Sequence, residues 1–143
     1  MKKRIWIVAV LCLVFSTLFL NRQGTARLAY VTQKENFQNA AQQILEQEDA
    51  EGVRRPQGVR DVSYCSRNTP VVEFELGGWG MGSATSYWGV RYVPSGELVG
   101  TQGSCMDGCR TQGKGTLFYE AEGDNTCYVE PLGGNWYYYE ERF

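Results

Sequence analysis

The stretch that decides the fold is Val71-Val-Glu-Phe-Glu-Leu-Gly-Gly-Trp-Gly-Met-Gly-Ser-Ala-Thr-Ser-Tyr-Trp-Gly-Val-Arg-Tyr-Val93. Its two ends, 71–76 and 86–93, are rich in β-branched and aromatic residues, which favour strands. The glycine-rich segment between them, 77–82, predicts a turn or bulge with Trp79 tucked into the core. It does not predict a dinucleotide site, because that fingerprint needs the spacing G-x-G-x-x-G and a following helix.

The same chemistry continues through the C-terminal half of the chain. Short aromatic and β-branched runs alternate with turns that contain glycine, such as Gly123-Asp-Asn125. Closely spaced strands without intervening helices predict an all-β domain over residues 59–143, an antiparallel meander folded as a small sandwich or partly closed barrel. Bulky neighbours such as Tyr87 and Trp88 favour two packed layers. The further strands are expected at 59–65, 97–100, 116–121, 126–131 and 135–140.

The first 21 residues have the composition of a membrane-targeting segment. A basic start at residues 2–4 precedes an apolar run at 5–20 that only Ser16 and Thr17 interrupt. At 1.5 Å per residue the run reaches roughly 24 Å, slightly less than the ~30 Å hydrocarbon core of a bilayer. We therefore expect a single-pass membrane anchor at residues 1–21, with a cleaved signal peptide as the alternative. The short N-terminal tail favours export of the domain that follows.

Residues 22–58 are expected to form a juxtamembrane helix and a linker. A capping-box pattern at 32–35 precedes an amphipathic stretch, which predicts a helix over 33–51. Gly52 is a suitable C-terminal stop, and the residues through Gly58 have the composition of a linker. The helix either packs against the β domain or spaces it from the membrane.

Four cysteines follow the apolar run: Cys65, Cys105, Cys109 and Cys127. An even number in a small exported domain predicts a disulfide framework. We expect Cys105–Cys109 across a short loop, and Cys65–Cys127 between the first strand and the penultimate one. Free thiols and a four-cysteine metal site are the alternatives. The metal site is disfavoured because there is no second closely spaced pair, so no metal or other cofactor is expected.

Charge and composition exclude several classes of function. The net charge is −2 and the sequence contains no histidine. Without clustered Lys and Arg, a nucleic-acid partner is not expected. Without histidine, Ser-His-Asp and Cys-His catalysis are excluded. A carboxylate pair could still hydrolyse a polysaccharide, although such residues more often form the solvated face of half-buried strands. The candidate carboxylates are Glu73, Glu75, Glu120 and Glu130.

The C-terminal hairpin supplies the candidate binding residues. A two-residue turn at Gly133-Gly134 pairs Glu130 with Tyr137 and Tyr128 with Tyr139. In this register Tyr128, Glu130, Tyr137 and Tyr139 share one exposed face, while Trp136, Tyr138 and their partners point inward. Such a face could stack on a sugar ring or anchor a protein partner. The alternative is an aromatic ladder, or a second core layer under the juxtamembrane helix.

The glycine- and tryptophan-rich stretch at 72–92, together with Gly123-Asp-Asn125 and the tail Asn135-Trp-Tyr-Tyr-Tyr-Glu-Glu-Arg-Phe143, resembles a group of small bacterial membrane-anchored proteins without an assigned activity. The resemblance implies an envelope location and contributes no catalytic residues. The expected function is a non-catalytic envelope module that binds a protein or glycan. A carboxylate-dependent hydrolase and a structural accessory protein are the alternatives.

Overall fold

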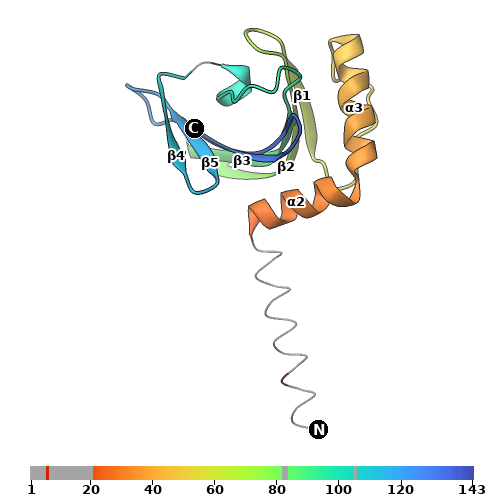
Figure 1. Cartoon of the computed structure of the whole chain (residues 1–143), viewed down its shortest axis with the longest axis horizontal. Coiled ribbons are helices and arrows are strands. Elements are labelled where there is room, and N and C mark those ends of the chain that lie inside the picture. The colour runs from red at the N-terminus through yellow and green to blue at the C-terminus, as the bar shows by residue number, and fades with distance from the viewer. Residues whose placement is uncertain (1–5, 7–20, 82–83, 105) are drawn as a thin grey trace.

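The structure is a computed structural model that describes residue 6 and residues 21–81, 84–104 and 106–143. Its centre is an antiparallel sheet in the order β1-β2-β3-β7-β6-β5-β4, which bends strongly without closing (Figure 1). The expected antiparallel β domain is confirmed, but it is one open sheet and not a sandwich. The strands are β1 (Asp61–Cys65), β2 (Val71–Met81), β3 (Ala84–Tyr92), β4 (Gly108–Gln112), β5 (Gly115–Tyr119), β6 (Thr126–Gly133) and β7 (Trp136–Arg142).

The sheet consists of two meanders that meet where β3 pairs with β7. The connection after β3 contains a short 3-10 helix, η1 (Thr101–Gly103), and leads to the far edge of the sheet. The prediction of a strand at 97–100 is wrong. Val99 and Gly100 lie in this connection, and their carbonyl oxygens accept hydrogen bonds from Arg91. Strand β4 escapes prediction because it is an edge strand whose residues are nearly all exposed, so no apolar alternation marks it.

A bulge and a central glycine accompany the bend of the sheet. The register of β2 against β3 shifts between Glu75 and Gly77, which marks a β-bulge. In β3, Gly89 approaches β2 so closely that an added Cβ would lie 2.0 Å from the carbonyl oxygen of Phe74. The bulge at the start of the glycine-rich segment agrees with the expected turn or bulge, and β2 continues through the glycines to Met81. Trp79 is 65% exposed, so its expected place in the core is wrong.

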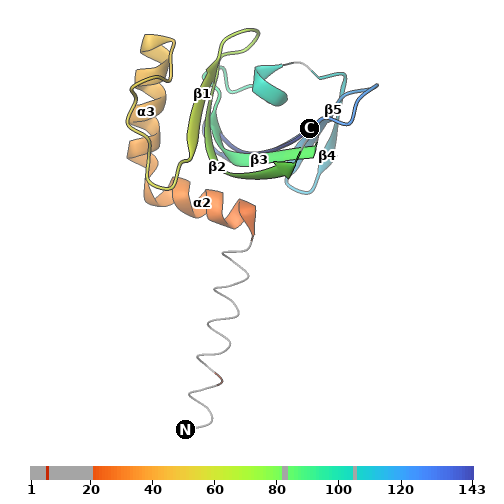
Figure 2. The same cartoon turned by 180° about the vertical axis from the view of Figure 1, so that it is seen from behind.

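Two helices, α2 (Arg22–Thr32) and α3 (Lys34–Gln47), cover the convex face of the sheet (Figure 2). Their apolar sides join alternate residues of β2, β3 and β7 in one core. In this core the ring centroid of Phe37 lies 5.1 Å from that of Phe74 and 6.0 Å from that of Trp136. The concave face has its own smaller apolar cluster around Val71, Cys127 and neighbouring side chains. Bulky residues therefore occur on both faces without a second sheet.

The helix boundaries differ from the single helix expected at 33–51. Thr32 ends α2, and its hydroxyl donates to carbonyl oxygens one turn earlier in the same helix. The predicted capping box is wrong, because Gln33 is the N-cap of α3 and makes no side-chain capping bond. The Gln33 side chain instead exchanges two hydrogen bonds with the backbone of Gln57, at 2.9 and 2.7 Å. These bonds hold the segment after α3 against the junction of the two helices.

The anchor expected at residues 1–21 lies almost entirely outside the described residues, which include only Trp6 and Asn21 of that segment. Within the part of the chain that the structure describes, no helix is both long and apolar enough to span a membrane. The anchor therefore stays a prediction from the sequence.

Candidate functional site

Alternation along the strands brings charged side chains together on the concave face. Glu73 and Glu75 are two residues apart on β2 and share this face, as expected for a strand. In the sheet, Arg91 of β3 is the partner of Glu73, and Asp61 of β1 is the partner of Glu75. The curvature of the sheet then directs these side chains toward a common centre.

Asp61, Glu73 and Glu75 line a pocket of about 330 Å³. Four carboxyl groups and three aromatic rings contribute to its wall, and among the described residues no lysine or arginine does. Gly89 lies between Glu75 and Tyr139 in the register and adds no side chain to this space. The lining residues are Asp61, Ser63, Glu73, Glu75, Tyr87, Gln102, Tyr139, Glu141 and Phe143.

Arg91 is fully buried and binds two of the carboxylates of the pocket. Its Nη2 lies 2.8 Å from Oε1 of Glu73 and 2.8 Å from Oε1 of Glu141. Its Nη1 donates to the carbonyl oxygens of Val99 and Gly100 at 3.1 and 2.9 Å, which ties the connection after β3 to the sheet. These partners are needed because an unpaired buried charge is strongly destabilising.

The protonation of Glu73 is shifted toward neutral pH. Burial raises the pKa of Glu73 to about 7, against the lowering effect of Arg91 and with a further rise from Glu141. Oε1 of Glu73 forms the ion pair with Arg91 but has no hydrogen bond of regular geometry, and Nε of Arg91 has no hydrogen-bond partner among the described residues. The charge of the pocket therefore changes with pH near neutrality.

Aromatic rings form a second part of the wall. The guanidinium carbon of Arg91 lies 4.5 Å from the ring centroid of Tyr139, a cation–π contact. Burial raises the pKa of Tyr139 well above its ordinary value, so this phenol is neutral in the physiological range. Tyr87 and Phe143 pack edge to face with centroids 6.2 Å apart. Carboxylates and ring faces both attract cations, so the pocket favours a positively charged ligand.

The register of the C-terminal hairpin differs from the expected one. Its turn is at residues 134–135 and not at 133–134, and a bulge lies between Pro131 and Gly133. Glu130 therefore pairs with Tyr138 and not with Tyr137. Because strand residues alternate between faces, this one-residue shift changes which residues of the two strands share a face.

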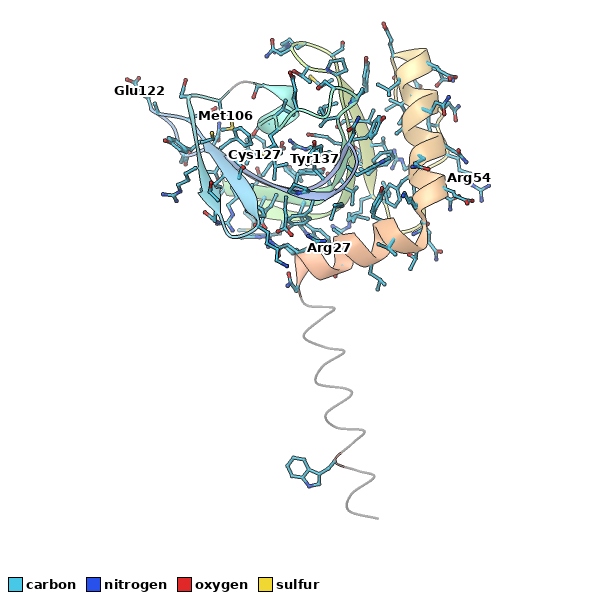
Figure 3. The ribbon with its side chains drawn as sticks, in the orientation of Figure 1. Arg27, Arg54, Met106, Glu122, Cys127 and Tyr137 are labelled. Carbon is cyan, nitrogen blue, oxygen red and sulfur yellow. The ribbon has the colours of Figure 1, made fainter. Side chains whose placement is uncertain are left out.

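The expected binding residues consequently lie on two different faces. Tyr137 and Tyr139 are buried on the concave side, where Tyr139 lines the pocket (Figure 3 labels Tyr137 within the curve of the sheet). Tyr128 and Glu130 lie on the convex side beneath α2. The Tyr128 hydroxyl donates to Glu130 at 2.7 Å, and Arg27 of α2 forms an ion pair with the same carboxylate. The prediction that these four residues share one exposed face is wrong. Tyr128 and Glu130 instead fit the alternative, in which they form a layer beneath the helix.

The carboxylates considered for hydrolysis are also separated. Glu73 and Glu75 line the pocket, Glu130 lies on the opposite face, and Glu120 follows β5 without contributing to the pocket wall. Glu73 and Glu130 are buried, so the expected solvated position is wrong for both. Among the described residues, no three His, Cys, Asp or Glu side chains are arranged to hold a metal ion.

Cys65, Cys109 and Cys127 are free thiols. The expected Cys65–Cys127 bridge is not formed, because β2, β3 and β7 lie between β1 and β6. The separation is about 19 Å along the sheet, whereas the Cα atoms of a disulfide lie within about 7 Å. The expected Cys105–Cys109 bridge is not formed either, because Cys109 is a free thiol; Cys105 itself lies outside the described residues. Burial raises the pKa of the Cys127 thiol to about 12, with a smaller opposing effect of Arg91.

Sequence reasoning did not identify Arg91, Glu141 or Asp61 as members of a site. The available signal was the alternation of β3, in which Arg91 shares a face with Gly89 and with the buried Val93. An arginine at an inward position requires a buried carboxylate partner, and Glu73 stands opposite it in the neighbouring strand.

Comparisons with known proteins do not assign the chain to a family. No protein-family model matches the chain, and neither a curated protein nor a solved structure matches it. The resemblance of the glycine-rich stretch and tail therefore stays a prediction.

Proposed function

We propose that this protein is a membrane-anchored, non-catalytic binding module of the bacterial cell envelope, and that its concave pocket receives a cationic side chain of a partner protein. The composition of the pocket carries the proposal. Even when Glu73 is protonated, the three carboxylates of Asp61, Glu75 and Glu141 face only two guanidinium groups. These are Arg91, which binds Glu141, and Arg55, which pairs with Asp61 at 3.1 Å. One net negative charge then remains at the site, and it favours an ammonium or guanidinium group.

The size of the pocket supports a single side chain as the ligand. Its volume of about 330 Å³ is near the lower end of the range of roughly 300–1,000 Å³ for ligand pockets. A Lys or Arg stem could pack against Tyr87 and Phe143 while its charged end meets the carboxylates. A neutral sugar could also stack on these rings, but the negative charge would contribute little to its binding.

The test uses the full chain in detergent micelles and measures binding by calorimetry. The probes are the amides of N-acetyl-lysine and N-acetyl-arginine, with the glutamine analogue and N-acetylglucosamine as neutral comparisons. We expect the cationic probes to bind preferentially and to bind less well as salt is raised. Asp61→Asn combined with Glu75→Gln should weaken them by about tenfold or more, whereas the exposed Glu122→Gln should not. If N-acetylglucosamine bound more tightly than the cationic probes, the proposed cationic side chain would be wrong and a glycan would be the ligand.

A carboxylate-dependent hydrolase is the second candidate. The observation in its favour is that the pKa of Glu73 is raised to about 7 in the same pocket as Glu75, which suits a general acid near neutral pH. Against it, Glu73 is nearly inaccessible and its Oε1 is paired with Arg91. Turnover of a panel of envelope polysaccharides that disappears in Glu73→Gln would establish the hydrolase and overturn the binding module.

A further inference from the structure

We propose that the domain rests directly on the lipid bilayer through one defined surface, here called the α2 surface. It consists of the outward side of α2 and the adjoining ends of β2 and β7. The inference requires that the apolar run at residues 5–20 is inserted in the membrane, and it is independent of the ligand of the concave pocket. The residues of the α2 surface are Arg22, Leu28, Val31, Trp79, Met81 and Arg142.

The first observation is that α2 is fixed to the sheet from its first residue. Nη1 of Arg22 donates to Oε1 of Glu140 at 2.8 Å and to Oγ of Ser86 at 3.3 Å. Only Asn21 separates Arg22 from the apolar run at 5–20. One residue spans at most about 3.6 Å, so no flexible tether is available. If residues 5–20 are inserted in a membrane, the domain attached to them must therefore lie close to the membrane surface.

The second observation is the exposure of large apolar side chains on the side of the molecule that bears α2. Leu28 is 50% and Val31 is 72% exposed, and their spacing of three residues gives them a common side of the helix. Trp79 and Met81 are 65% and 87% exposed. They belong to the convex face, because Trp79 pairs with Ser86, which binds the first residue of α2. Such side chains are stabilised at a membrane interface, where tryptophan is enriched.

The third observation is a hollow of about 330 Å³ beside the start of α2 that combines basic and aromatic side chains. Arg22, Arg142, Trp79 and Phe143 contribute to its lining. Glu140 pairs with both arginines, so these three side chains together carry one positive charge, and the Arg142 side chain is 68% exposed. This chemistry suits a lipid phosphate with its adjoining acyl chain. Together with the missing tether, it selects the bilayer as the occupant over a protein partner or a second copy.

The test places the full chain in phosphatidylcholine–phosphatidylglycerol vesicles that carry a nitroxide on the lipid headgroup. The fluorescence of Trp79 is obtained as the difference between the wild type and Trp79→Phe. We expect the headgroup nitroxide to quench about half or more of this signal, and aqueous acrylamide to quench little of it. The double substitution Leu28→Asp and Val31→Asp should reduce the nitroxide quenching by about half or more.

The matched control is Glu122→Trp in the Trp79→Phe background. Glu122 lies at the end of the domain opposite to Arg27 and α2 (Figure 3). This reporter should be quenched by acrylamide and not by the nitroxide. Trp79 behaving in the same way as this reporter would overturn the proposal, because the domain would then stand clear of the lipid. Failure of the full chain to float with vesicles would overturn it as well, by removing the membrane insertion on which it rests.

Discussion

Replacing Glu73 with Gln should change how the stability of the fold depends on pH. The pKa of Glu73 is raised from its ordinary 4.5 to about 7 by burial, so the folded chain holds this proton more tightly than the unfolded chain. The resulting stabilisation is complete below pH 4.5 and is lost as pH rises through about 7. At about 1.4 kcal/mol per pKa unit, the loss amounts to about 3 kcal/mol. Glu73→Gln has no proton to lose, so it should escape this decline.

The assay is urea unfolding of the full chain in detergent micelles, followed by tryptophan fluorescence at several values between pH 4.5 and 8. The free energy of unfolding of Glu73→Gln, relative to the wild type, should rise by about 3 kcal/mol across this range. The matched control, Glu122→Gln, is on the surface and should show no such trend. A difference that is flat or falls with pH would refute the reasoning, because Arg91 would then keep Glu73 ionised throughout.

Three further changes test the packing and the free thiols. Gly89→Ala should cost about 1–3 kcal/mol in urea unfolding, because its Cβ would meet the carbonyl oxygen of Phe74; unchanged stability would contradict that close approach. Trp136→Ala should cost about 3–5 kcal/mol and reduce the helical circular dichroism, because its ring contacts aromatic rings of both helices. Iodoacetamide should label Cys109 in the native chain but Cys127 only in urea, since Cys127 is buried and its pKa is about 12; equal labelling would refute that burial.

Most strands could be predicted because their residues favour extended backbone and glycines separate them. The C-terminal register could not, for a reason that lies in the residues themselves. Tyr137, Tyr138 and Tyr139 are identical neighbours, so hydrophobic alternation does not say which of them points inward. Gly133-Gly134 and Gly134-Asn135 are both suitable two-residue turns, and the choice between them moves the partners by one position. The candidate binding face depended on that choice.

α2 gave no local signal for a related reason. Its buried side toward the sheet is formed by only Ala26 and Tyr30, so the apolar stripe is narrow. Arg22 and Arg27 instead hold the helix through carboxylates of β7 and β6. Ion pairs between segments about 100 residues apart cannot be read from helical periodicity, because each partner alone is an ordinary surface charge.

The two proposed surfaces lie on opposite sides of one sheet, and this arrangement links them. α2 covers the convex face, whereas the pocket with Asp61 and Glu75 opens on the concave face. A domain that rests on the bilayer through α2 therefore turns its pocket away from the lipid, toward a partner in the surrounding compartment. Gly89 packs closely against β2 beside the bulge that follows its partner Glu75, and so supports the curved sheet that carries both surfaces. A flatter sheet would open the pocket and would separate α2 from the carboxylates that hold it.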